Sequence, residues 1–434
     1  FSLFYAALFA IPVRESFADG VFRLNSPELA RSARLAPELQ RERCREGDLR
    51  TMEFNIWAFV TPIALGLLIF EIILSLLTQK GYYTFQETIA NLGTAIGNQT
   101  VNLLVAVFVF WSFGLLYENY AMTEIPVTWW SAALLLVLID FLFYWFHRVG
   151  HRVNLFWAAH MPHHSAEEMN IAVGLRASVT QRLFSFAFFW PLPLLGFDPF
   201  FMYTMVGVHL FMSLWHHTKV IKSLGWFEVW FNTPSHHRVH HGMNKQYIDK
   251  NFGEFLIIWD KMFGTFEPEV EEPCYGVLYP PKSWNPLVSN FQHYIYLFKS
   301  SWHAPYFWDK IKIWFMPPSW RPRGMRDGEL LDGMPKEQIT RYHSKMFPNC
   351  RPYLIAQIVL GMAFMVFVID GKSPLSAYEK IAGSGLIWMM VVAWSGILES
   401  KRWAPLLEIT RLALMAGLVV YGFEKYRLTA VAAM

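Results

Sequence analysis

Residues 131–164 read SAALLLVLIDFLFYWFHRVGHRVNLFWAAHMPHH, an apolar run that leads directly into five histidines. A run of roughly 20 apolar residues is what a helix needs to cross the hydrocarbon core of a bilayer. Its end carries an H-x-x-x-H motif, and an H-x-x-H-H motif follows within the same stretch. Because residues three and four apart share one face of a helix, each motif directs its imidazoles toward one point at the end of the span.

A third histidine motif, again H-x-x-H-H, occupies residues 237–241. Of the 15 histidines, 12 lie between residues 147 and 241, where uniform scatter would place about three. Neutral imidazole is a ligand suited to iron, copper or zinc. Nine imidazoles exceed what one ion can use, so we predict two neighbouring metal ions. The predicted ligands, which are also the predicted catalytic residues, are His147, His151, His160, His163, His164, His217, His237, His240 and His241.

The composition places the chain in a membrane. Hydrophobic residues make up 54% of the 434 residues and charged residues only 16%, against roughly 25% charged in soluble domains. The net charge of +3 is small, which argues against a nucleic-acid partner and fits a membrane surface. The three cysteines, Cys44, Cys274 and Cys350, lie far apart without a C-x-x-C pair. Disulfide scaffolds, zinc ribbons and iron–sulfur clusters are therefore not expected.

The apolar segments predict how the chain crosses the membrane. Residues 55–78, 98–117 and 128–146 are long and apolar enough to span it. The apolar segment 183–217 is broken at its middle by prolines and a glycine, which predicts a helical hairpin that enters and leaves on one side. The histidines before and after this hairpin can therefore meet in one layer.

The second half of the chain alternates between polar and apolar character. Residues 218–350 carry many charges, prolines and tryptophans without a spanning run, which predicts a cap at the membrane interface with aromatic side chains at headgroup level. Residues 352–369, 381–398 and 404–423 predict a separable C-terminal bundle. In the last of these segments Glu408 and Arg411 lie one helical turn apart, where a local ion pair is expected.

Together these segments predict an all-α protein, a polytopic membrane helix bundle with a cytoplasmic histidine-rich di-metal cap and an additional C-terminal helical bundle. We divide the chain into residues 1–54, an N-terminal segment without an assigned role, residues 55–350, a membrane domain with the histidine motifs and the interfacial cap, and residues 351–434, the C-terminal transmembrane bundle. The arginines beside the first two motifs predict that the site faces the cytoplasm. The arginines of residues 14–50 point the other way, but acids nearly match them in number.

Residues around the ligands have predicted roles of their own. A metal-bound imidazole needs a hydrogen-bond acceptor for its second ring nitrogen, and the carboxylates near in sequence are Asp140, Glu167, Glu168, Asp249 and Asp260.

Arg152 directly follows a predicted ligand. A guanidinium is a poor metal ligand, but it donates two parallel hydrogen bonds to a carboxylate or phosphate. We therefore predict that Arg152 pairs with Glu167 or Glu168 or holds a lipid headgroup phosphate. The alternative is that Arg152 only anchors the cytoplasmic end of the helix at the membrane surface. His209 lies about 12 Å of helix deeper than His217 and is predicted to line the core or a substrate channel. His216 and His236 are intermediate, and His293, His303 and His343 are predicted at the surface.

The sequence resembles the fatty acid hydroxylase and sterol desaturase superfamily. The likeness rests on FYWFHRVGH (143–151), NLFWAAHMPHHSAEEMN (154–170), GLRAS, WHHT and, above all, NTPSHHRVHHGMNKQYIDKNFGEFLIIWDKMFGTFEPE (232–269). It runs from about residue 55 to about residue 285 and is nearest to the alkylglycerol monooxygenase family. The resemblance implies a di-iron centre held by the nine histidines named above. In that family an acid follows the H-x-x-x-H motif, whereas Arg152 stands here, so substrate or reductant contacts are expected to differ at this position.

The resemblance also implies a reaction. Two iron ions would activate O2 to hydroxylate a C–H bond of a lipid taken from the bilayer. If that bond lies beside the ether oxygen of an alkylglycerol, the product is a hemiacetal that separates into an aldehyde and a glycerol derivative. Electrons would come from an external reductant, either the tetrahydropterin that the family implies or a separate electron-transfer protein, because the chain has no HPGG haem-binding segment and no iron–sulfur cysteines.

Other functions fit parts of the pattern. Histidine spacing indicates the oxidant but not the bond attacked, so a sterol, carotenoid or fatty-acyl hydroxylase or desaturase is the alternative within the enzyme class. A membrane haem electron carrier is disfavoured because its ligands stand singly at mid-membrane, whereas these stand in groups at helix ends. A metal transporter would need polar residues through the bilayer. The early predicted spans offer almost none, so this function is also disfavoured. A zinc hydrolase is the remaining alternative, and it would not require oxygen.

Overall fold

The computed structural model describes residues 56–325, 341–371 and 373–432. These parts of the chain are helical, and their only extended pairings are two isolated bridges, Phe231 with Leu256 and Gly242 with Tyr275. The all-α prediction is therefore confirmed. The N-terminal segment 1–54, with its arginines, lies outside the described residues.

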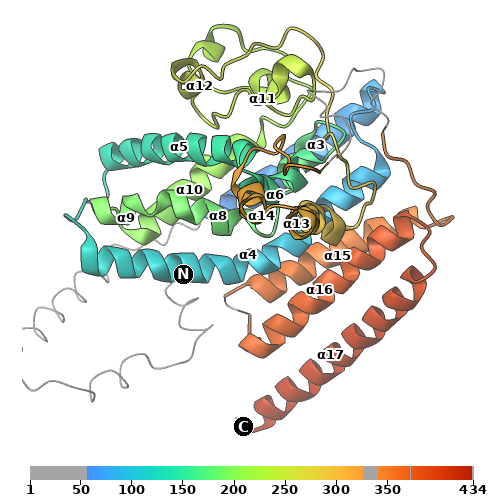
Figure 1. Ribbon diagram of the computed structural model, residues 1–434. Helices are drawn as coiled ribbons and strands as arrows, with labels where there is room; N and C mark the ends of the chain where they lie inside the picture. Colours follow the sequence, from blue (N-terminus) through green and yellow to red (C-terminus); the bar gives the residue numbers. More distant parts are fainter. Residues whose placement is uncertain (1–55, 326–340, 372, 433–434) are drawn as a thin grey trace, which may run out of the picture.

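Five helices in the described chain have the length and apolarity needed to cross a membrane. They are α4 (Phe85–Tyr120), α5 (Trp129–Arg152), α15 (Arg351–Ile369), α16 (Ala377–Leu398) and α17 (Ala404–Ala432). The predicted first span at residues 55–78 corresponds to α3 (Ile56–Thr78), an apolar helix of 23 residues. The chain is thus an integral membrane protein with a multi-helix bundle (Figure 1).

The predicted hairpin is formed by three helices. They are α8 (Gln181–Phe189), α9 (Pro191–Leu195) and α10 (Pro199–Leu214). Asp198 caps α10 by accepting from the backbone N–H groups of Phe200 and Phe201, each at 2.9 Å, and Gly196 turns the chain with φ of 106°. The Ile125 N–H donates to the Gly196 carbonyl at 2.9 Å. The tip of the hairpin therefore reaches the connection between α4 and α5, and both arms return to the histidine layer.

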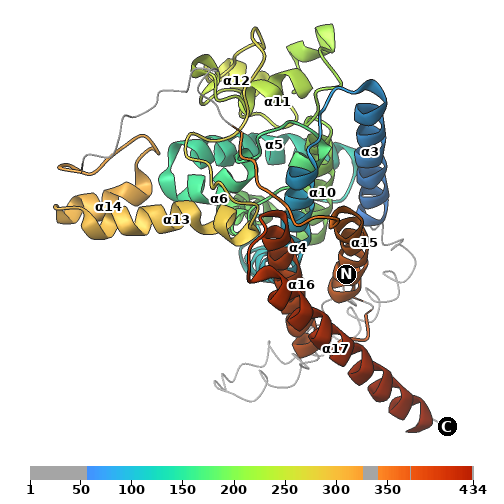
Figure 2. The same ribbon diagram turned by 90° about the vertical axis from the view of Figure 1, so that its right-hand side faces the viewer.

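The histidine layer and the cap consist of short helices. They are α6 (Asn154–His164), α7 (Ile171–Gly174), η1 (Gly225–Val229), α11 (Pro234–His240), η2 (Lys245–Tyr247), α12 (Ile258–Met262), α13 (Pro286–His303) and α14 (Phe307–Phe315). The lobe with α11 and α12 lies over α5, whereas α13 and α14 run side by side across the direction of α4 and α5 (Figure 2). None of the described cap helices meets the criteria for a membrane span, as the sequence predicted.

The last three helices share a core with the first part of the chain. Trp394 and Val391 of α16 pack against Gly93 of α4, and Trp388 packs against Gly97. The α17 helix packs on α16 and extends away from the rest of the bundle (Figure 2). The predicted ion pair within α17 is present, because Arg411 Nη2 lies 2.5 Å from Glu408 Oε1.

Candidate metal centre

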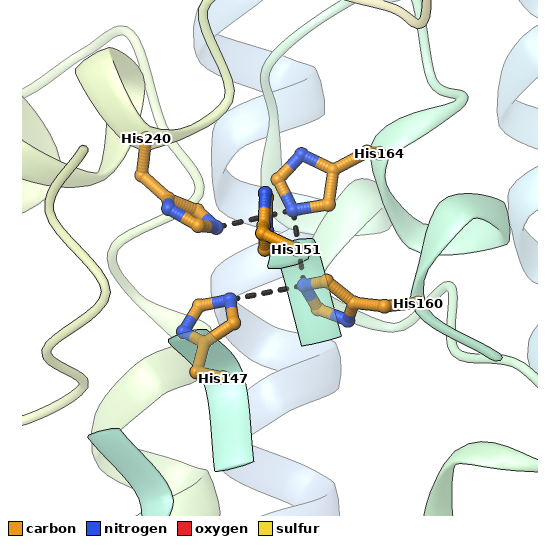
Figure 3. Close-up of side chains that lie close together, drawn as sticks. All are labelled: His147, His151, His160, His164 and His240. Atoms are coloured by element: carbon orange, nitrogen blue, oxygen red, sulfur yellow. Dashed lines mark hydrogen bonds between the residues drawn. The ribbon is translucent and has the colours of Figure 1, made fainter. Parts of the chain in front are cut away.

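Nine histidines gather into two adjacent groups at the end of α5. The five-histidine site takes two residues from α5, two from α6 and one from α11 (Figure 3), and consists of His147, His151, His160, His164 and His240. The four-histidine site lies beside it and consists of His163, His217, His237 and His241. Within each site the ring nitrogens that could bind an ion all lie within 4.8 Å of one another. The structure thus assembles all nine predicted ligands, from motifs on both sides of the hairpin.

The Nε2 atoms converge in each site. The Nε2 atom of His160 lies 2.9 Å from that of His147 and 3.0 Å from that of His164. In the four-histidine site the Nε2 atom of His237 lies 2.9 Å from that of His217 and 3.2 Å from that of His241. The two sites touch, because the rings of His164 and His241 stack with their centroids 4.2 Å apart. Two ions held here would be neighbours.

The hydrogen bonds of the outer ring nitrogens decide which tautomers are present. The Nδ1 atoms of His147, His163 and His240 lie 2.8 to 3.0 Å from the backbone carbonyls of Phe252, Arg176 and Lys250. A carbonyl can only accept, so each Nδ1 carries the hydrogen and each Nε2 presents a lone pair inward. Several inward lone pairs this close together repel one another unless a cation binds between them. The donor set therefore fits a pair of metal ions.

Burial keeps these imidazoles neutral. It lowers the pKa of His163 to about 4 and that of His240 to about 3. Both rings are therefore unprotonated at neutral pH, which is the state that binds a metal. The Nε2 atom of His151 is buried and has no hydrogen-bond partner in the described chain, as expected of a nitrogen that binds a metal.

The carboxylate of Asp249 lies beside the predicted ligand His151. Its Oδ1 atom lies 3.7 Å from Nδ1 of His151, and its Oδ2 atom lies 3.1 Å from Nε of Arg152. Arg152 is thus placed beside the five-histidine site, but its protein partner is Asp249. The predicted pairing of Arg152 with Glu167 or Glu168 is wrong, because Glu168 pairs with Lys219 at 2.5 Å and with Arg341.

The other predicted carboxylates act on the backbone around the site. Asp260 accepts from the N–H groups of Phe252 and Gly253 at 2.8 and 2.7 Å, which fixes the carbonyl that receives the His147 hydrogen bond. Asp140 lies 2.8 Å from Nε2 of His209. His209 is buried and belongs to neither site, so it is a core residue at this position.

Sequence reasoning missed Glu71, which supports His217. This buried carboxylate of α3 accepts from the Ile171 N–H at 2.8 Å and from the hydroxyl of Thr218, the residue after His217. A carboxylate inside an apolar helix is itself a signal for such a role. The prediction for His293 is wrong, because its Nε2 atom lies 3.0 Å from Asn154 Oδ1 between α13 and α6.

Comparison with known proteins agrees with this geometry. A family model described as fatty acid hydroxylase matches residues 132–265, which hold all nine histidines. An alkylglycerol monooxygenase of Xenopus tropicalis is 35% identical over 72% of this chain and 70% of its own length. The chain belongs to the fatty acid hydroxylase family. The alkylglycerol monooxygenases of Homo sapiens and Danio rerio are 33% and 32% identical, over 84% and 86% of this chain and 82% and 84% of their own lengths. No solved structure matches the chain.

Family membership establishes the class of enzyme. The chain is an oxidoreductase that acts as a membrane lipid hydroxylase or monooxygenase. Its all-histidine sites are consistent with an iron-dependent oxygenase.

Proposed function

We propose that this enzyme hydroxylates the carbon beside the ether oxygen of an alkylglycerol and so releases an aldehyde and a glycerol derivative. The observation that carries the proposal is the pair of adjacent histidine sites in a chain that is 32 to 35% identical to alkylglycerol monooxygenases. The nine histidines of the two sites would hold two iron ions, which supply oxygen activation when bound. One oxygen atom enters the lipid, and the other leaves as water with two electrons and two protons from an external reductant, a tetrahydropterin or a separate electron-transfer protein.

The apolar wall beside the five-histidine site suits a lipid chain. Phe143 packs with its ring centroid 5.4 Å from that of His147, and it belongs to a buried cluster with Phe146, Phe113 and Phe201. This cluster lies among α4, α5 and the hairpin, within the membrane bundle. It would admit an alkyl chain from the bilayer and exclude water from the reacting carbon.

We also propose that the two sites face the cytoplasm, with the cap at the headgroup level of that leaflet. The arginines near the histidine motifs support this orientation. The α13 helix agrees with an interfacial position, because Phe298 and Trp302 are exposed on its surface beside Lys299. We further propose that the domain with the histidine sites and the cap extends from residue 55 to residue 350, between the N-terminal segment and the C-terminal bundle.

The test uses purified, iron-loaded protein with hexadecylglycerol, a reductant and labelled O2. We expect hexadecanal that carries the label, trapped by borohydride reduction as labelled hexadecanol. Tetrahydropterin and a reduced electron-transfer protein are supplied in separate reactions to identify the donor. Oxygen-dependent labelling of a sterol or an acyl chain, with hexadecylglycerol left intact, would contradict ether cleavage.

A further inference from the structure

One face of α4 changes from polar to apolar along its length. Asn91, Asn98 and Asn102 stand seven and four residues apart, so they share one face of the helix. All three are buried, with 0, 2 and 5% of their surface exposed. Phe113 lies eleven residues after Asn102 on the same face and is also buried. Polar side chains thus give way to an aromatic one within about 33 Å of helix.

The polar end of this face points to the histidine layer. Asn91 Oδ1 accepts from Arg176 Nη1 at 2.8 Å, and the carbonyl of Arg176 is the acceptor for His163. Gly93 and Gly97 lie on the other side of α4, against α16. The stripe of asparagines therefore faces the catalytic half of the bundle and not the C-terminal helices.

The apolar end of the face belongs to the aromatic wall described above. Phe113 packs in the buried cluster that contains Phe143, and Val109 and Leu116 pack against the same cluster. The face therefore runs from the level of the metal sites into an apolar environment. This order is the order of groups in a lipid, with the polar head at one end and the chain at the other.

The asparagines retain unused hydrogen-bonding capacity. Nδ2 of Asn91, Oδ1 of Asn98 and Oδ1 of Asn102 are buried and have no partner among the described residues. An unpaired polar atom inside a membrane bundle is costly, and native structures keep few of them without a reason. The amides offer both donors and acceptors, which is what hydroxyl groups need.

We propose that Asn98 and Asn102 bind the hydroxyl groups of a lipid that has a compact, uncharged headgroup, with the chain lying along Val109 and Phe113. Neutral amides favour hydroxyls over a phosphate, and Arg176 already donates to Asn91, Pro162 and Ser165. The inference rests on the proposed function, because it assigns the headgroup end of that substrate. It makes the two asparagines specificity residues and predicts that the oxidised carbon is near the polar end of the chain.

The test measures anaerobic binding, so that it does not depend on turnover. Iron-loaded protein binds two probes, hexadecylglycerol and the same lipid with both hydroxyls capped as an acetonide. The variants are Asn98→Leu and Asn102→Leu, which keep the branching of the side chain. The control is Thr100→Val, a buried position between them whose hydroxyl donates to the Gly97 carbonyl of its own helix. Iron content is measured for each variant to show that the histidine sites are intact.

We expect wild-type protein and Thr100→Val to bind the free diol with an affinity about tenfold or more above that for the capped lipid. Each asparagine variant should lose about tenfold in affinity for the diol, whereas its affinity for the capped lipid should stay unchanged. Equal affinities for the two probes in wild-type protein would overturn the inference, as would a diol preference that survives in both variants. If one leucine variant fails to hold iron, the other decides. A separate aerobic assay with hexadecylglycerol distinguishes failure of the proposed function, because binding preference and product formation are read independently.

Discussion

Gly174 sets how closely the backbone approaches His217. A Cβ atom at Gly174 would lie 2.9 Å from Nδ1 of His217 and 3.0 Å from Leu214. We expect Gly174→Ala to displace His217 and to weaken metal binding at the four-histidine site by roughly 10- to 100-fold. Gly150→Ala is the control, because a Cβ atom there meets His160 only at 3.8 Å. Equal iron affinity in the two variants, measured by chelator competition, would show that this close approach is unimportant.

Asp249 and Arg152 test how the five-histidine site is supported. Asp249 has a left-handed backbone with φ of 58°, which asparagine also adopts, so Asp249→Asn removes the charge with little backbone strain. We expect this variant to lose iron affinity roughly tenfold.

Arg152 is half exposed, and Arg152→Lys should change the KM for lipid by less than about threefold. A raised KM in Arg152→Lys with normal iron binding in Asp249→Asn would instead favour headgroup recognition by Arg152.

At the scale of single residues the sequence predicted which histidines meet but not what holds them. The motif spacing placed His160 and His164 on one helix face, because that spacing is a property of the helix alone. The acceptors for His147 and His240 are backbone carbonyls, and every residue has a carbonyl, so no sequence pattern marks them. Asp249 lies almost a hundred positions after His151, and only the tertiary fold brings the two together.

At the scale of elements, α13 docks on α6 through His293. Burial, with Arg321 nearby, lowers the pKa of His293 to about 4, below the value of about 6.5 in an unfolded chain. Between these values the unfolded chain takes up a proton that the folded chain does not, so stability falls as the pH decreases. From pH 7.5 to 5.5 we expect wild-type protein to lose about 1 kcal/mol more than His293→Gln. Parallel stability losses of the two proteins in thermal unfolding would contradict this.

The helices themselves were largely predictable, because apolar length is enough to identify a span. The segment predicted at 98–117 is a longer helix, since α4 begins at Phe85. Its first turns carry the polar residues Glu87 and Asn91, and a hydropathy pattern places such residues outside an apolar span. Both are buried because their side chains hydrogen bond to the chain after α6. Tertiary contacts therefore extend the helix beyond the apolar run.

For the whole molecule, the hairpin predicts which loops share one side of the membrane. Lys222 and Lys245 lie exposed in the cap, and Met122 lies exposed in the connection between α4 and α5. We expect Lys222→Cys and Lys245→Cys to react with an impermeant thiol reagent from the same side, and Met122→Cys from the opposite side. Labelling of all three positions from one side would contradict the path of α5 and the hairpin.

We predict that one chain holds two neighbouring iron ions in its two histidine sites. The most direct measurement is the iron content per chain of purified protein, determined for wild-type protein, for His240→Ala in the five-histidine site and for His163→Ala in the four-histidine site. We predict about two iron ions in wild-type protein and a loss of iron in each variant, while His303→Ala, an exposed position on α13, keeps both. A single ion in wild-type protein, unchanged in both site variants, would contradict a two-iron centre.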